Sequence, residues 1–408
     1  MDPLSYLFSL EQFGIKLGLD NIRTLLARLG NPQRAFRSIH IAGTNGKGSV
    51  TAMVDAVLRR AGHRSSRYTS PHLVDLSERF VIDGRPVTAD DLRRSAADVR
   101  ASIEALIAEG TLSGQPTFFE ATTAMAFDLF RNARVEFAVV EVGLGGRLDS
   151  TNVIDPVVTA ITSIDFDHQK YLGDTLAEIA AEKAGIIKPG VPVIVGRMTP
   201  EAYDVIARIA GERKAALIPA DNTPAAYGSI RVGLRGEHQV ANANVAIGIL
   251  ESIERLGVVI GKQAIVDGLA KVDWPGRLDH RTLPDGREIV LDAAHNPAGA
   301  RALASYLRSL GGDKPTLVFG AMRDKDVDGM LMALLPQIGR VLVTKPSNAR
   351  AADPDELVAR IRALAPSLQV DVVASPHDAV SVATHSSVLT VVAGSIFLLG
   401  DIMQEFRA

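Results

Sequence analysis

Hydrophobic and polar positions follow two alternating patterns along most of the chain. Short, continuous apolar segments of the kind that form buried strands occur at 38–42, 137–142, 157–164 and 191–195. Segments with apolar residues at helical spacing separate them, as at 50–60 and 175–184. Because parallel strands buried on both faces are continuous apolar runs joined by helices, the pattern predicts an α/β fold with a mostly parallel sheet.

Two local patterns add detail to this prediction. Residues 1–37 contain a helical pattern whose apolar face is formed by Ile22, Leu25, Leu26 and Leu29. Gly30-Asn-Pro follows that face and predicts the end of the helix. Within 79–87, the pair Asp83-Gly84 is a strong signal for a tight β-hairpin, so two short antiparallel strands are expected there.

The alternation of strands and helices pauses at Pro275-Gly276 and then starts again. Further strands are expected at 288–292, 316–319, 341–344, 370–373 and 395–399, each next to a helix-like segment. A chain of 408 residues is also longer than one ordinary core requires. We therefore predict two domains, at 1–274 and 275–408, of which the second is the smaller.

Composition narrows the range of functions. Hydrophobic residues make up 47% and charged residues 22%, which is typical of a packed globular protein, and the net charge of -3 gives no field that attracts nucleic acid. The chain has no cysteine, so disulfides and thiolate metal sites are excluded. No apolar run approaches the roughly 20 residues of a membrane helix, and the first residues do not resemble a secretion signal. We expect a cytoplasmic protein with neither nucleic-acid nor membrane partners.

The most specific chemical signal is the glycine-rich stretch Gly43-Thr-Asn-Gly-Lys-Gly-Ser49. It follows a predicted strand and precedes a predicted helix, which is the context of a phosphate-binding loop, although its spacing is not that of the Walker A motif. Glycines let the backbone approach an anion, the helix N-terminus adds positive potential, and Lys47 supplies a full charge. We predict that this loop binds phosphate.

Polar residues follow two other predicted strands, and each has two interpretations. Glu141 ends one strand, where it is either a magnesium ligand or a cap for the following loop. Asp167-His168 follows the next strand, and a histidine there is more often satisfied by ordinary hydrogen bonds than by a metal. Lys183 stands near a helix C-terminus, where it either complements the helix dipole or has a chemical role. For Glu141, the flanking glycines and the preceding phosphate loop favour the metal, whereas periodicity does not decide between the interpretations of His168 and Lys183.

Two further motifs combine structural and chemical signals. Thr117-Phe-Phe-Glu120 matches a capping box at the start of a helix, while its aromatic residues would suit the floor of a pocket for a flat ring. Asp292-Ala-Ala-His295, followed by Asn296 and Pro297, stands between a strand and a helix of the second domain. This is more polar chemistry than a turn needs, so a ligand-facing site is favoured there.

Together these motifs resemble the folylpolyglutamate synthase and dihydrofolate synthase family, which is related to the muramyl peptide ligases. In the first domain the similar segments are Gly14-Ile-Lys-Leu-Gly-Leu-Asp20, Gly43–Ser49, Thr69-Ser-Pro-His-Leu73, Glu141–Asp149, Asp167-His168 and Glu182–Gly190. The later segments are His238-Gln239 with Asn242, Pro275-Gly-Arg-Leu278, Asp292–Pro297 and Asp324-Lys-Asp326. The resemblance implies a P-loop-type ATPase domain with a mostly parallel sheet, followed by a smaller Rossmann-like α/β domain.

The resemblance also implies roles for particular residues. It assigns ATP contacts to Gly43, Thr44, Asn45, Gly46, Lys47, Gly48, Ser49, Asn242, Arg277 and Asp292. It assigns the pterin-substrate pocket to Thr117, Phe118, Arg147, Leu148 and Asp149. Ser70 and Glu141 match the ligands of one magnesium ion and His168 that of a second, while Lys183 matches a lysine that is carbamylated. His295 and Arg350 match the side where glutamate enters, and Lys47, Lys183 and His295 are the implied catalytic residues.

The implied reaction joins L-glutamate to a pterin carboxylate through an acyl phosphate, with ATP converted to ADP and phosphate. The sequence leaves open whether the substrate is dihydropteroate, a reduced folate or both, because Asp149-Ser150 stands where the family often has Asp-Ala. A second departure, Asp292-Ala293 in place of Asp-Gly, lies in the later domain. A monomer with only small-molecule partners is expected.

Two other functions compete with this one. A muramyl peptide ligase would use the same chemistry on another carboxylate, but only 42 residues precede Gly43, fewer than a nucleotide-sugar domain needs. An ATP-binding regulatory module would not require Asp292, His295 or a set of metal ligands. The ligase acting on pterins is therefore the favoured hypothesis.

Overall fold

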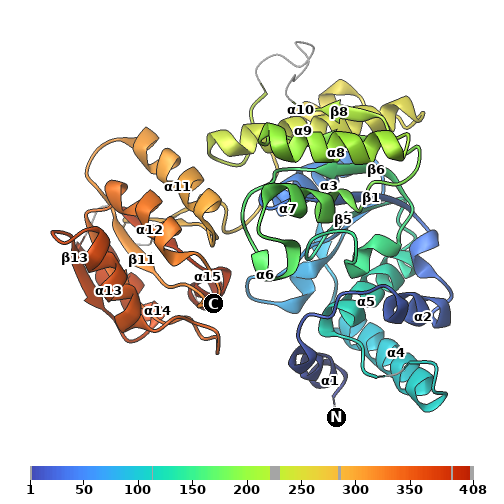
Figure 1. Ribbon diagram of the computed structural model, residues 1–408, viewed down its shortest axis with the longest axis horizontal. Coiled ribbons are helices and arrows are strands. Elements are labelled where there is room, and N and C mark those ends of the chain that lie inside the picture. Colours follow the sequence, from blue (N-terminus) through green and yellow to red (C-terminus); the bar gives the residue numbers. More distant parts are fainter. Residues whose placement is uncertain (1, 113, 221–229, 284–285, 387–388, 405–408) are drawn as a thin grey trace. The chain divides into compact units, whose positions relative to one another are not determined.

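The structure, a computed structural model, describes residues 2–112, 114–220, 230–283, 286–386 and 389–404. The chain forms two compact units. The first unit comprises Met1–Gly233 and Ala241–Val272, and the second comprises Leu234–Val240 and Asp273–Ala408 (Figure 1).

Strands and helices alternate along much of the chain in both units. The strands of the first unit are β1 (Arg37–Ala42), β2 (Ser65–Tyr68), β3 (Phe80–Ile82), β4 (Arg85–Pro86), β5 (Phe137–Glu141), β6 (Pro156–Ile161), β7 (Val193–Val195) and β8 (Leu217–Pro219). Its helices are α1 (Pro3–Ser9), α2 (Asp20–Arg28), α3 (Lys47–Arg60), α4 (Ala89–Ala108), α5 (Phe118–Asn132), α6 (Gln169–Leu172), α7 (Leu176–Ala184), α8 (Pro200–Glu212) and α10 (Lys262–Ala270). The long helix α9 (Glu237–Arg255) contains residues of both units.

Within the described residues, the strands of the first unit form one sheet in the order β4-β3-β2-β5-β1-β6-β7-β8. From β2 to β8 all neighbours are parallel, and only β3 and β4 are antiparallel. The turn between β3 and β4 has positive φ at Asp83 (48°) and Gly84 (79°), as the tight hairpin predicted there requires. The α/β fold with a mostly parallel sheet is confirmed.

Helices cover both faces of the first sheet. One face carries a large hydrophobic core formed with α1, α2, α4 and α5, and a second core formed with α7 and α8. Helices α9 and α10 lie on the opposite side of the sheet from α4 and α5 (Figure 1). Both faces of the central strands are therefore buried, which explains why their sequences are continuously apolar rather than alternating.

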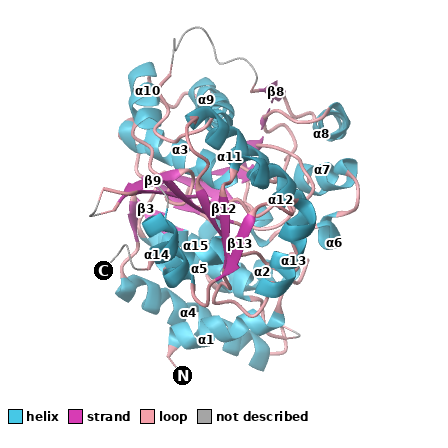
Figure 2. Cartoon of the chain, turned by 90° about the vertical axis from the view of Figure 1, so that its left-hand side faces the viewer, coloured by secondary structure: helices cyan, strands magenta, loops and turns pink. Residues whose placement is uncertain are grey.

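The second unit has its own sheet, in the order β13-β12-β11-β14-β10-β9 among the described residues. These strands are β9 (Asp279–Thr282), β10 (Glu288–Leu291), β11 (Thr316–Phe319), β12 (Arg340–Val343), β13 (Gln369–Val372) and β14 (Leu389–Ala393), and only β9 is antiparallel to its neighbour. The helices are α11 (Pro297–Leu310), α12 (Val327–Leu334), α13 (Pro354–Leu364), α14 (Pro376–Ser386) and α15 (Ile396–Met403). Figure 2 shows α12 and α13 on one side of β12 and β13, with α14 and α15 on the other.

One predicted strand is wrong. Residues 395–399 do not form a strand, because Ser395 caps the N-terminus of α15 by accepting a hydrogen bond from the N–H of Phe397 at 3.1 Å. Among the described residues the last strand is β14 (Leu389–Ala393), upstream of the predicted position. A short apolar run does not distinguish a buried strand from a buried helix, and here a serine cap after Gly394 decides for the helix.

None of the helices in the described part of the chain is long and apolar enough to cross a membrane.

Candidate active site

The predicted phosphate loop connects β1 to α3 in the first unit. Gly43 has a φ of 148°, and a Cβ atom there would lie 1.9 Å from Thr162 Oγ1. Gly46 has a φ of 84°, and its Cβ would lie 2.3 Å from Asn242 Oδ1. Both positions therefore require glycine, for conformation and for space. The structure also brings Asn242, on α9, against the loop, although the two are far apart in sequence.

Groups that follow β6 hold the loop in place. The Thr44 N–H donates to the Ser163 carbonyl at 2.8 Å, and the Asn45 N–H donates to Ser163 Oγ at 3.1 Å. Thr44 Oγ1 accepts from the Asp165 N–H at 3.0 Å. After the loop, α3 begins at Lys47 with Gly46 as N-cap and no side-chain cap. The N–H groups of its first turn therefore suit an anionic ligand.

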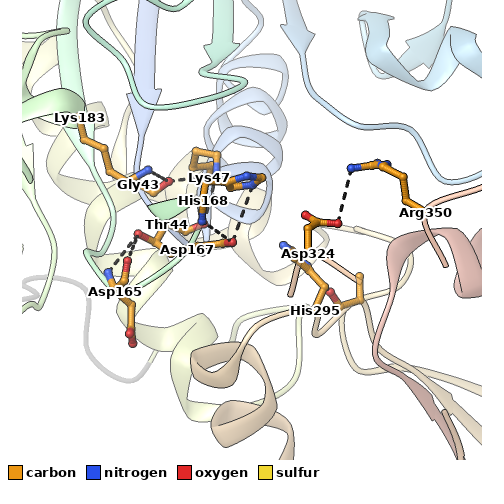
Figure 3. Close-up of polar contacts among 11 residues, drawn as sticks. Gly43, Thr44, Lys47, Asp165, Asp167, His168, Lys183, His295, Asp324 and Arg350 are labelled. Carbon is orange, nitrogen blue, oxygen red and sulfur yellow. Dashed lines mark hydrogen bonds and ion pairs between the residues drawn. The ribbon is translucent and has the colours of Figure 1, made fainter. Parts of the chain in front are cut away.

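Two lysines converge on the same carbonyl oxygen of this loop. Lys47 Nζ donates to the Gly43 oxygen at 3.0 Å and to the Thr44 oxygen at 3.2 Å, and Lys183 Nζ donates to the Gly43 oxygen at 3.0 Å (Figure 3). Burial, together with the charge of Lys47, lowers the pKa of Lys183 to about 7, against the opposing effect of Asp167 and Asp149. Lys183 is therefore placed as a buried amine that loses its proton near neutral pH.

The carboxylate of Glu141 ends β5 beside the end of β1, where Ile41 is its partner in the parallel register. Glu141 is buried, and its Oε2 accepts a hydrogen bond from the Ser70 N–H at 3.4 Å. Since parallel strands carry their ligand sites at their carboxyl ends, Glu141 and the phosphate loop share the functional edge of the sheet. The structure therefore brings together Ser70 and Glu141, the two residues matched to one magnesium ion.

His168 lies after β6, at this same edge. Its backbone is left-handed, with a φ of 52°, its N–H donates to Asp167 Oδ1 at 2.9 Å, and its Nε2 lies 3.9 Å from the same oxygen (Figure 3). In the described residues, no three His, Cys, Asp or Glu side chains are grouped to hold a metal ion by themselves. Magnesium usually takes only one or two protein carboxylates and completes its shell with water and phosphate oxygens, so Glu141 in this setting fits such an ion.

The residues matched to the pterin pocket fall in two places. Thr117 and Glu120 form a capping box at the start of α5, so the structural interpretation of that motif is confirmed. The Phe118 ring is buried; it stacks on Phe8 with ring centroids 5.8 Å apart and has the Arg79 guanidinium 5.2 Å from its centroid. Sequence patterns do not single out Arg79. No local signal marks it, because its burial depends on packing against elements distant in the chain.

The segment from Arg147 to Asp149 is the second part of this predicted pocket. Arg147 is exposed and pairs with Glu182 at 2.8 Å, while Leu148 is half-buried. Asp149 is buried and accepts hydrogen bonds from the N–H groups of Leu144 at 2.7 Å and Thr151 at 3.0 Å. Burial raises the pKa of the Asp149 carboxyl, and these hydrogen bonds oppose the rise.

In the second unit, Asp292 follows β10 and organises the backbone around it. Its Oδ2 accepts from the Leu278 N–H at 2.8 Å and its Oδ1 from the Ala294 N–H at 2.9 Å. Burial raises the pKa of the Asp292 carboxyl, and the charge of Arg277 opposes that rise. Arg277 and Asp292, both matched to ATP contacts, therefore lie near each other within this unit.

His295 and Arg350 belong to the same unit. His295 Nδ1 lies 2.8 Å from the Ala293 carbonyl oxygen, which can only accept, so Nδ1 carries a proton and the neutral ring has its lone pair on Nε2. Arg350 forms an exposed ion pair with Asp324, with 3.8 Å between Arg350 Nη1 and Asp324 Oδ1 (Figure 3). The central carbon of its guanidinium lies 5.6 Å from the centroid of the Phe397 ring.

Comparisons with known proteins give the class of this chain. Residues 276–396 match the family model described as Mur ligase, glutamate ligase domain. This match, together with the ligases among the relatives below, places the chain among the ATP-dependent ligases of the Mur ligase group.

Individual relatives narrow the class. The chain is 37% identical, over 82% of its length and 82% of the relative, to the dihydrofolate synthase/folylpolyglutamate synthase of Bacillus subtilis. The Mycobacterium tuberculosis folylpolyglutamate synthase complexed with ADP and AMPPCP has a TM-score of 0.89 and 35% identity, covering 100% of this chain and 99% of that one. Escherichia coli FolC in complex with DHPP and ADP has a TM-score of 0.87 and 28% identity, covering 100% and 98%. The chain belongs to the dihydrofolate synthase/folylpolyglutamate synthase family, as the resemblance predicted.

Proposed function

We propose that this protein is an ATP-dependent ligase that joins L-glutamate to the carboxylate of a pterin substrate, either dihydropteroate, a reduced folate or both. The observation that carries the proposal is the loop edge of the first sheet, where Lys47 and Lys183 meet at Gly43 and Glu141 ends the neighbouring strand. Family membership supports the nature of the substrates.

The first chemical step transfers phosphate. A carboxylate oxygen of the pterin substrate attacks the γ-phosphorus of ATP, the bond from that phosphorus to the bridging oxygen breaks, and ADP leaves with an acyl phosphate formed. Lys47 and the amides of the first turn of α3 neutralise and orient the phosphates, which is the main contribution a protein makes to such a step. When bound, magnesium supplies further charge neutralisation on the phosphate oxygens.

The second step forms the amide. The glutamate amine attacks the acyl carbon, the carbon–oxygen bond to phosphate breaks, inorganic phosphate leaves and the nitrogen loses a proton. His295, with its Nδ1 proton held by the Ala293 carbonyl, offers Nε2 to accept that proton or to orient the amine. We propose that Arg350 binds a glutamate carboxylate and that Arg277, Asp292 and Asn242 contact ATP, as the resemblance implies.

We propose that Ser70 and Glu141 hold one magnesium ion and His168 a second. We further propose that Lys183 is carbamylated. Its pKa of about 7 supports this, because the uncharged amine is the form that attacks carbon dioxide, forming a nitrogen–carbon bond with loss of one proton. The new carboxylate would be a hard oxygen ligand of the kind magnesium prefers.

The carbamylation of Lys183 can be tested separately from the ligase activity. Lys183→Ala should remove most activity with little loss of stability, and bicarbonate or a short-chain carboxylic acid should restore part of it by supplying the missing oxygen ligand. Full activity of a folded Lys183→Ala protein would disprove the carbamate while leaving the ligase in place.

The function itself is tested with a substrate panel. Purified protein, which we propose is a monomer, is assayed for ADP release with dihydropteroate, reduced folates or UDP-sugar peptides, each with and without L-glutamate. Glutamate-dependent ADP release with a pterin, and a product heavier by one glutamyl residue in mass spectrometry, are expected. The proposal would be overturned if UDP-sugar peptides were the only substrates that support ADP release, or if no substrate of the panel supported it.

A further inference from the structure

His40 is a buried histidine that the proposed reaction does not use. It lies on β1, three residues before Gly43, and its residue exposure is 0%. Its Nε2 lies 2.8 Å from the hydroxyl oxygen of Thr151, which is also completely buried. Thr151 belongs to a short 3₁₀ helix at Ser150–Val153, so this contact joins the strand that leads into the phosphate loop to the segment that follows Asp149.

The direction of the hydrogen bonds follows from their partners. The Thr151 hydroxyl donates to Asp149 Oδ1, which also accepts from the Thr151 N–H at 3.0 Å. A hydroxyl has one proton, so the Thr151 oxygen must accept from His40, and His40 carries its proton on Nε2. Burial and the charge of Lys188 lower the pKa of His40 to about 3, which agrees with a neutral ring that has a single proton.

The surroundings of His40 Nδ1 indicate that His40 does more than fill space in the core. In the described part of the chain this buried atom has no hydrogen-bond partner. Buried polar atoms are normally paired, and an apolar side chain of similar size would fill this space without an unpaired acceptor. The feature that the histidine provides, and that an apolar side chain would lack, is the hydrogen bond to Thr151.

Asp149 connects Thr151 to the loop that follows β5. While Oδ1 faces Thr151, Oδ2 accepts from the Leu144 N–H at 2.7 Å. The carboxylate thus links the 3₁₀ helix with the glycine-rich segment 143–147, which comes directly after Glu141 and Val142. A rotation of this carboxylate would break contacts on both sides, so a donor that fixes the Thr151 hydroxyl also fixes the loop.

We propose that His40 is a positioning residue for the pterin substrate, acting through Thr151 on Asp149 and on the loop at 143–147. The inference rests on the proposed function, in which Asp149 belongs to the pterin pocket. His40 does not touch the substrate; it holds the direction of one hydroxyl proton so that the Asp149 carboxylate keeps a single orientation.

The test compares matched variants at two positions. His40→Leu and Thr151→Val remove the chain of hydrogen bonds, while His40→Gln and Thr151→Ser keep a donor and a hydroxyl near the original atoms. We expect the first pair to raise the KM for the pterin substrate by about two- to tenfold, the usual range for the loss of one hydrogen bond, with an unchanged KM for ATP. The second pair should restore the pterin KM.

A double-mutant cycle completes the test. Because both changes break one chain, His40→Leu combined with Thr151→Val should raise the pterin KM no further than the worse single variant. Equal changes in the KM values for pterin and ATP, additive effects, or a failure of His40→Gln to restore the pterin KM would overturn the inference.

Two controls keep the outcomes distinct. If His40→Leu does not fold, the Thr151→Val and Thr151→Ser pair gives the same comparison. If the unmodified protein ligates glutamate to no pterin, the proposed function fails; if it does so and His40→Leu leaves the pterin KM unchanged, only the role of His40 fails.

Discussion

The two units share one local architecture, in which a parallel strand is followed by a polar turn and a helix. They differ in how the N-terminus of that helix is capped. In the first unit α3 begins behind Gly46, which has no side chain to cap the helix. In the second unit α11 begins behind Asn296, whose Oδ1 accepts from the Gly299 N–H at 2.9 Å, with Pro297 in the first turn. The first helix keeps its N-terminal N–H groups open to an anion, whereas the second is closed by its own side chain.

This difference explains the contrasting composition of the two turns. An open helix end needs glycines that bring the backbone close to phosphate, together with a lysine to balance its charge. A capped helix end is closed by its own side chain, so the ligand-facing role that we propose for this turn falls to Asp292 and His295. Four groups of variants test this contrast between an open and a capped helix end.

The largest effect is expected at Lys47. Lys47→Ala should lower kcat by at least about a hundredfold, because one preorganised charge at a reacting phosphate contributes about 2.7 to 4 kcal/mol to transition-state binding. Steady-state kinetics measures the loss, and the thermal midpoint should stay unchanged. Lys262→Ala, at an exposed lysine at the start of α10, is the control and should keep full activity. A folded Lys47→Ala protein with near-normal turnover would contradict the phosphate-loop assignment.

Gly46→Ala should be the next most damaging change. The added methyl would lie 2.3 Å from Asn242 Oδ1 at a φ of 84°, so either the loop or Asn242 must move, and we expect the KM for ATP to rise about tenfold. Gly190→Ala is a matched control, since Gly190 has a similar φ of 73° but no other group within 4 Å of the place where the methyl would stand. Gly190→Ala should bind ATP like the unmodified protein, and a Gly46→Ala variant that did the same would contradict the prediction that the added methyl disturbs the phosphate loop.

The lowered pKa of Lys183 predicts that the free energy of unfolding depends on pH, in buffer free of carbon dioxide. Its native pKa of about 7 lies below the ordinary 10.5, so between these values the unfolded chain binds more protons and the free energy of unfolding rises with pH. The slope from this group is at most about 1.4 kcal/mol per pH unit. Urea titrations from pH 7 to 10 should show this rise in the unmodified protein and a smaller one in Lys183→Met; identical slopes would place the amine in a solvated environment.

The smallest effect is expected at the capped helix. Asn296→Ala should lower the free energy of unfolding by about 1 kcal/mol, because the Gly299 N–H loses its acceptor, and Asn296→Asp should retain most of the stability. Chemical denaturation measures both. A loss of ATP affinity with unchanged stability would show instead that Asn296 serves a ligand rather than the helix.

Part of the candidate site followed from sequence patterns alone. The loop at 43–49, the acid at the end of β5 and the capping box at Thr117 each depend on residues that are close in sequence, so their local structure was predictable. The assignment of Lys183 was not, because at the end of α7 it satisfies a helix-dipole pattern equally well. Its burial and its contact with the Gly43 oxygen, at 3.0 Å, distinguish it from an ordinary helix-end lysine.

Hydrophobic periodicity predicted the α/β class, because it acts over a few residues, and the resemblance of the motifs predicted the family; both are confirmed. Glycine spacing predicted the position of the phosphate loop, which stays a prediction. Only the folded molecule shows that Asn242 faces Gly46, that Arg79 lies over Phe118, that His40 reaches Asp149 through Thr151, and that 395–399 begins a helix. These features escape local patterns because burial, desolvation and hydrogen-bond direction depend on partners from other strands and helices. Those partners become neighbours only when the sheets are assembled.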